Sequence, residues 1–158
     1  MSANSIFVIA ICIGIVAGLR AVTAPAAISW AAYLGWLNLH GSPLSFMGSI
    51  IAVVLFSLGA IGEFINDKLP KTPNRTAPPQ LIARIVMGAL SGACVCASAG
   101  QSLIVGALLG AIGALIGTFG GFQVRAQLTS SLKTLGIFVA ILEDLVAIAF
   151  AYFLVSRG

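Results

Sequence analysis

The chain has 158 residues, of which 59% are hydrophobic and only 8% charged, with a net charge of +4 and a mean hydropathy of +1.11. Globular domains carry about 25% charged residues, so this composition excludes an ordinary water-soluble domain. We expect an integral membrane protein with one transmembrane domain over residues 1–158 and no nucleic-acid partner. The three cysteines lie in apolar segments at spacings that suggest neither a disulfide framework nor a metal site, and no cofactor is expected.

The first apolar segment, residues 5–37, is too long to be one spanning helix. As a straight helix it would measure about 50 Å, whereas the hydrocarbon core of a bilayer is about 30 Å thick. Gly18 and Arg20 favour the end of one helix, Thr23 can cap the N-terminus of the next, and Pro25 suits its first turn. The sequence therefore predicts helices at about 5–19 and 24–38, the second of them short or re-entrant.

Four further helices are predicted after the polar turn that contains His40. They cover about 46–65, 80–98, 102–121 and 131–156. The predicted fold is an all-α polytopic membrane helix bundle of about six helices, with five full spans and the short second helix. Glycines spaced by four residues, such as Gly106/Gly110 and Gly88/Gly92, favour close packing because they let helix backbones approach in lipid. A glycine-lined path for a small solute is the alternative.

Basic residues set the predicted orientation. If the N-terminus is outside, seven of the eight basic residues fall on the cytoplasmic side together with the loops at 67–79 and 122–130. These seven are Arg20, Lys68, Lys71, Arg75, Arg84, Arg125 and Lys133. The N-terminus is outside if residues 5–37 cross twice and inside if they cross once.

The four acidic residues form two clusters. Glu63 and Asp67 share one helix face, and Glu143 and Asp144 lie within an otherwise uncharged run at 135–155. Each acid at mid-membrane costs about 2.5–3.5 kcal/mol, so these side chains are expected to face partners, water or an ion rather than lipid. They can exchange a proton or bind a cation; fixed pairing with Arg125 or a backbone donor is the alternative.

Two arginines end predicted helices on the cytoplasmic side. Arg20 and Arg125 can steer an anion or pair with the acids, or they can extend to lipid headgroups and set the topology. The predicted transport or binding residues are therefore Glu143, Asp144, Glu63, Asp67, Arg20 and Arg125.

The leading functional hypothesis is a small membrane transporter or channel, coupled to protons or a cation, that forms a homodimer and contacts membrane lipids and a small ion or solute. A membrane scaffold or assembly protein without transport is the first alternative. An enzyme acting on lipid headgroups at the cytoplasmic interface is the second, but no nucleophile beside an evident base supports it.

Short motifs in this order resemble a bacterial membrane family known as domain of unknown function 4126. They are Gly18-Leu19-Arg20 with a following proline, Glu63 through Asp67-Lys68-Leu69-Pro70, and Arg125-Ala126 followed by Glu143-Asp144. The resemblance implies a compact multi-span fold in a bacterial inner membrane, and it directs attention to the charged residues of these motifs and to Pro70, but it implies no activity.

Overall fold

The structure is a computed structural model that describes residues 2–66, 77–131, 141, 145–146, 148–153 and 156. Its described elements are all helical, which confirms the predicted all-α class. In chain order they are α1 (Ala3–Leu19), α2 (Thr23–Tyr33), the 3₁₀ helix η1 (Ser45–Gly48), α3 (Ile50–Asn66), α4 (Pro78–Ser98) and α5 (Leu103–Ser131). The described residues between 141 and 153 are helical as well.

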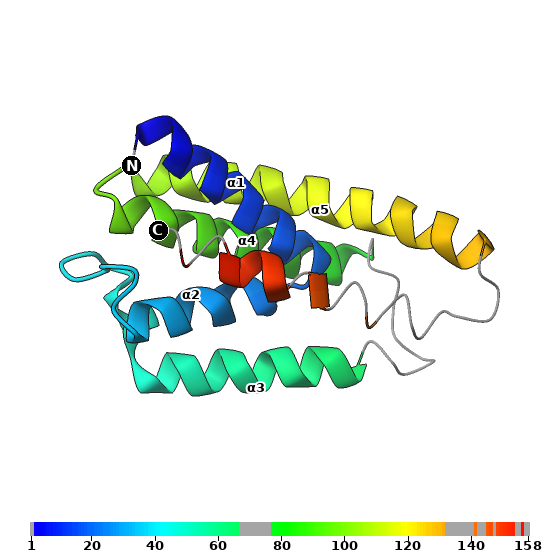
Figure 1. The fold of residues 1–158 in the computed structure, drawn as a ribbon, viewed down its shortest axis with the longest axis horizontal. Helices are drawn as coiled ribbons and strands as arrows, with labels where there is room; N and C mark the ends of the chain where they lie inside the picture. The colour runs from blue at the N-terminus through cyan, green and yellow to red at the C-terminus, as the bar shows by residue number, and fades with distance from the viewer. Residues whose placement is uncertain are drawn as a thin grey trace.

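Helices α1, α4 and α5 pack against one another as a group, and α2 and α3 lie beside it (Figure 1). Glycines occupy the places where the three backbones approach most closely. A methyl group at Gly92 on α4 would lie 2.9 Å from the Cα atom of Gly110, and one at Gly18 on α1 would lie 2.6 Å from the backbone nitrogen of Thr118. Backbone atoms therefore fill the space along these glycine faces, so the alternative of a solute path there is wrong.

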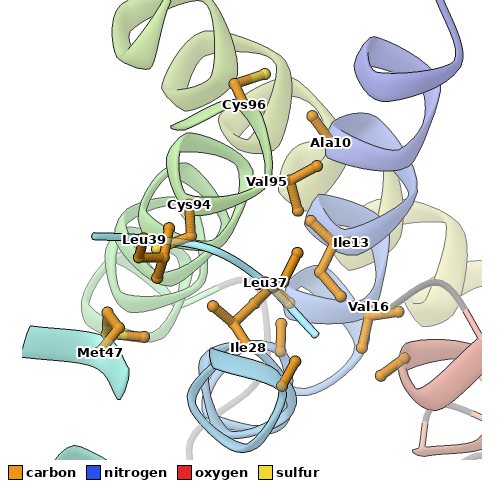
Figure 2. Packing of buried hydrophobic residues seen from close by; sticks show 14 of the residues in the cluster. Ala10, Ile13, Val16, Ile28, Leu37, Leu39, Met47, Cys94, Val95 and Cys96 are labelled. Atoms are coloured by element: carbon orange, nitrogen blue, oxygen red, sulfur yellow. The ribbon is translucent and has the colours of Figure 1, made fainter. Parts of the chain in front are cut away.

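The hydrophobic core lies where α1, α2 and α4 meet the irregular segment after α2. Figure 2 shows Ile13, Ile28 and Leu37 converging from different parts of the chain, and all three are buried. Leu39 and Met47 from the irregular segment are buried with them. Through Leu37, Leu39 and Met47 the segment covers part of the core, while most of its other residues are exposed.

Helix α2 ends at Tyr33, five residues before the predicted end at residue 38. Gly35 has a φ of +80° and turns the chain away from the helix axis. The backbone N–H groups of Gly35 and Trp36 donate to the carbonyls of Ala32 and Ala31, at 3.2 and 2.8 Å. This pair of bonds is the Schellman arrangement, which ends a helix by satisfying its last carbonyl groups.

The prediction of a loop at 122–130 is wrong, because α5 continues through it to Ser131. The sequence after Gly120 and Gly121 contains no proline and several good helix formers, so the two glycines do not end the helix. Figure 1 shows this end of α5 extending beyond the ends of α1 and α3. Residues 67–76 of the other predicted loop lie outside the described residues.

Among the described helices, α4 and residues 103–127 of α5 are long and apolar enough to cross a membrane, compared with the five spans predicted, and most of the predicted helix at 131–156 lies outside the described residues. The apolar helices α1 and α3 have 17 residues each, which is shorter. Large hydrophobic side chains point outward on α3 and α5, where Ile51 is 76% and Ile104 73% exposed.

Candidate functional site at the helix break

The chain is interrupted between α1 and α2, where residues 20–22 leave the helical path. Arg20 is extended, with φ of −141° and ψ of 109°. Such a break leaves carbonyl groups at the end of α1 and N–H groups at the start of α2 without partners in their own helix. In an apolar bundle these groups need polar partners from elsewhere in the chain.

Glu63 of α3 supplies the acceptors for the start of α2. Its Oε1 accepts from the backbone N–H of Ala21 at 2.8 Å, and its Oε2 accepts from that of Val22 at 3.0 Å. A carboxylate at this position also interacts favourably with the positive end of the helix dipole. The single side chain therefore satisfies the two backbone N–H groups that immediately precede α2.

The prediction that Thr23 caps α2 is wrong. Val22 is the N-cap residue, Thr23 is already helical, and no side chain of either residue makes a cap hydrogen bond. The Thr23 hydroxyl is buried and has no hydrogen-bond partner within the described part of the chain. The Glu63 carboxylate, some forty residues away, accepts instead from the N–H groups of Ala21 and Val22, which precede the groups that an N-cap side chain at Thr23 would reach.

Arg84 of α4 supplies the donors for the end of α1. Its side chain is 2% exposed, and Nη1 donates to the carbonyls of Gly18 and Leu19, the latter at 2.9 Å. The Thr118 hydroxyl of α5 donates to the Gly18 carbonyl at 3.3 Å and to the Ala114 carbonyl at 2.7 Å. A cation at a helix C-terminus is favourable for the same reason as the anion at the N-terminus.

Arg20 is 1% exposed and lies over the ring of Phe64, with 4.9 Å between its guanidinium carbon and the ring centroid. This distance is in the range of a cation–π interaction. Burial rules out the alternative in which Arg20 extends to lipid headgroups. Three charged side chains, Arg20, Glu63 and Arg84, are thus assembled at the break.

A small polar pocket of about 220 Å³ opens beside these groups, and we call it the junction pocket. Its polar lining comes from Glu63 and Asn66 of α3 and from Gln80 and Arg84 of α4. The remaining lining residues are Ala21, Val22, Gly62 and Ala83. A carboxylate, two amides and a guanidinium can together donate to and accept from a small polar solute.

Sequence reasoning located part of this site. Of its six candidates, Glu63 and Arg20 lie at the break, whereas Asp67, Glu143 and Asp144 lie outside the described residues. Arg125 is seven residues beyond Thr118 on α5, about 10 Å further along the helix axis, so the fold does not bring it to the break.

Arg84 was missed, because it was counted only among the basic residues that set topology. Its signal is spacing: Arg84 precedes Gly88 by four residues and Gly92 by eight, so it shares the face of α4 that packs against the bundle. Within the described ranges, no group of three or more His, Cys, Asp or Glu side chains could hold a metal ion.

Comparison with protein families gives one match. The model of the family described as Domain of unknown function (DUF4126) matches residues 7–156, so the chain belongs to this family. No curated protein and no solved structure matches the chain.

Proposed function

We propose that this DUF4126 protein is a multi-pass membrane protein that transports a small polar or ionic solute, with the junction pocket as part of the path. The observation that carries the proposal is the interrupted helix held by two charged side chains, Glu63 and Arg84, beside a polar pocket. Discontinuous helices with exposed backbone groups form the solute and ion sites of many secondary transporters.

Membrane placement is supported by two helices of spanning length and by the outward-facing hydrophobic side chains of α3 and α5. If α1 starts at one surface of the hydrocarbon core, its length of about 25 Å puts Leu19 and the break close to the opposite surface, because the core is about 30 Å thick. A bacterial inner membrane and a homodimer stay predictions from the sequence.

The Glu63 carboxylate is the group that can couple binding to a structural change. Its two oxygens accept from the start of α2, so a proton on Glu63 would remove one acceptor and loosen this end of the helix. A bound anion could occupy the released N–H groups, and a cation could bind the carboxylate directly. Asp67, Glu143 and Asp144 would extend the path, and we assign them to it on their charge alone.

Transport is tested with purified protein in liposomes, followed with dyes for internal pH and for cations and with a panel of small labelled solutes. We expect flux above that of protein-free liposomes, and a loss of about tenfold or more in Glu63→Gln and in the double variant Glu143→Gln/Asp144→Asn. Ser57→Ala is the matched control on α3, because Ser57 lies outside the junction pocket. Transport is refuted if wild-type protein gives no flux for any solute in the panel.

A membrane scaffold without transport is the second candidate, and one observation favours it. Both oxygens of Glu63 and one terminal nitrogen of Arg84 already contact the main chain, as they would if their role were only to hold the break. A scaffold predicts no flux, a partner that co-purifies at fixed stoichiometry, and retention of that partner in any folded Glu63 variant.

A further inference from the structure

A second and larger cavity lies between α2, α3 and the helical residues 148–152. Its volume is about 460 Å³. Alanines on α2 and α3, among them Ala27 and Ala60, leave the space open, and Trp30, Trp36 and Tyr152 line it as well. Volumes of about 300–1,000 Å³ with a mainly apolar and aromatic lining are typical of small-molecule sites. We call it the α2–α3 cavity.

The lining carries no charged side chain among the residues that the structure describes. The indole N–H of Trp30 donates to the Ser57 hydroxyl at 3.0 Å, so these two polar groups partner each other. Trp36 and Tyr152 contact edge to face, with 5.8 Å between ring centroids. An ion would therefore lose its hydration here without compensation, and the cavity fits an uncharged, mainly apolar occupant.

One polar group at the edge of this cavity points to the nature of the occupant. Thr23 lines the cavity, is only 6% exposed, and has no hydrogen-bond partner for its hydroxyl within the described residues. A buried hydroxyl without a partner costs about 1–3 kcal/mol. An occupant that carries one hydrogen-bond acceptor at this end would remove that cost.

The cavity has a polar end and an apolar length. Thr23 is at the start of α2, beside the backbone groups that Glu63 caps, and Trp30 is two turns further along the helix. Phe64, which also lines the cavity, carries the guanidinium of Arg20 on its ring. Positive charge is thus near the Thr23 end, at the level where we place the membrane surface.

The cavity is open toward the side of the bundle. Its lining residues Trp30, Ile61 and Tyr152 are 48%, 55% and 62% exposed. On α3 the cavity adjoins the outward-facing hydrophobic side chains Leu58 and Ile65. An occupant can therefore enter from the hydrocarbon region without crossing a polar surface.

We propose that the α2–α3 cavity binds one acyl chain of a membrane phospholipid, with an ester carbonyl of that lipid accepting a hydrogen bond from the Thr23 hydroxyl. This assignment rests on the membrane placement in the proposed function but not on transport. The uncharged lining fits the acyl chain, and the Thr23 hydroxyl fits the ester.

The test uses the full chain in vesicles of phosphatidylethanolamine and phosphatidylglycerol that contain a phospholipid with a photoreactive diazirine on one acyl chain. After illumination, mass spectrometry maps the labelled peptides. We expect label on cavity residues of α2 and α3, and a reduction of about tenfold in Ala60→Phe, whose ring would fill the cavity. Leu58→Phe, on the same helix but outside the cavity, is the matched control and should keep wild-type labelling there.

Thr23→Val tests the hydrogen bond separately from the fold. It should lower cavity labelling about two- to tenfold, the equivalent of one hydrogen bond. Its thermal stability in lipid-free detergent should equal or exceed that of wild type, because the variant removes a buried hydroxyl that lacks a partner.

The assignment is overturned if Ala60→Phe and Leu58→Phe label alike in the cavity, or if the label lies only on the outer face of α3. It is also overturned if the species that co-purifies in the cavity carries no acyl ester. If the cavity is labelled but no flux is measured, transport is refuted and the acyl site is not. If flux is measured but cavity labelling does not differ between wild type and the variants, the acyl site is refuted and transport is not.

Discussion

Replacing Gly110 of α5 with alanine should force α4 and α5 apart. The added methyl carbon would meet the carbonyl oxygen of Gly88 first, and it would lie 2.9 Å from the carbonyl carbon of Gly88 and 3.1 Å from the Cα atom of Gly92. Carbon atoms in contact are about 3.5–4.0 Å apart, and the carbonyl oxygen of Gly88 would lie closer still, so the helices would have to separate by about 1 Å or more. Both neighbours are backbone atoms within a helix, and no side-chain rotation can relieve the contact.

The loss of stability in Gly110→Ala can be estimated from the known cost of overpacking. Extra methylene groups in a tightly packed interior cost about 1–3 kcal/mol, and a gap of about 0.5–1 Å loses a quarter to a half of each affected dispersion contact. For a chain of this length, each kcal/mol lowers the melting temperature by about 2–4 °C. We therefore expect Gly110→Ala to melt about 2–12 °C below wild type.

Gly120→Ala is the matched control, because Gly120 is on the same helix and an added methyl group would meet nothing within 4 Å. Alanine favours a helix over glycine by about 0.5–1 kcal/mol, so this variant should melt at or above the wild-type temperature. Both are measured by tryptophan fluorescence in one detergent, with size-exclusion profiles at each temperature. The packing argument fails if Gly110→Ala is as stable as Gly120→Ala.

Three side chains at the helix break give further predictions, measured in the same melting assay. Glu63→Ala leaves the backbone N–H groups of Ala21 and Val22, just before α2, without their acceptor and should cost about 1–3 kcal/mol, whereas Ser57→Ala should cost about 1 kcal/mol or less. Equal losses would contradict the role of Glu63 at the start of α2. Arg84→Met should cost about 1.5–3 kcal/mol, and Arg84→Lys should recover part of it by donating to the Gly18 carbonyl; no recovery would mean that volume rather than charge matters. Thr118→Val should cost about 0.5–1.5 kcal/mol, and a neutral result would show that its hydroxyl contributes nothing to the α1–α5 contact.

The position of the break was predictable because its causes are local. A 33-residue apolar segment cannot cross as one helix, and Gly18 and Arg20 mark where it ends, so the prediction of residue 19 as the end of α1 is confirmed. Gly35 also marks the early end of α2. The apolar residues after it continue the hydrophobic pattern of a spanning helix, so the sequence predicted a longer helix. Buried irregular chain such as Leu37 and Leu39 has the same composition as a spanning helix.

The groups that hold the break were not predictable from local sequence. Thr23 is a good N-cap residue by type, yet Val22 is the N-cap, and the Glu63 carboxylate from another helix accepts from the N–H groups of Ala21 and Val22. Arg84 makes its contacts across sixty-five residues or more. Such partners follow from how helices pack, and a single sequence shows only that a buried arginine on the glycine face needs some acceptor.

The origin of the two caps also constrains how the protein is made. A chain that enters a bilayer from its N-terminus presents the α1–α2 pair before Glu63 and Arg84 have been synthesised. Until then, the backbone groups at residues 18–22 must remain hydrated, since each one exposed to lipid costs several kcal/mol. With the membrane placement that we propose, insertion of α2 would be completed only after α3 and α4 have been synthesised. Truncation of the chain before residue 84 should then leave the N-terminal segment as a substrate for membrane quality-control proteases.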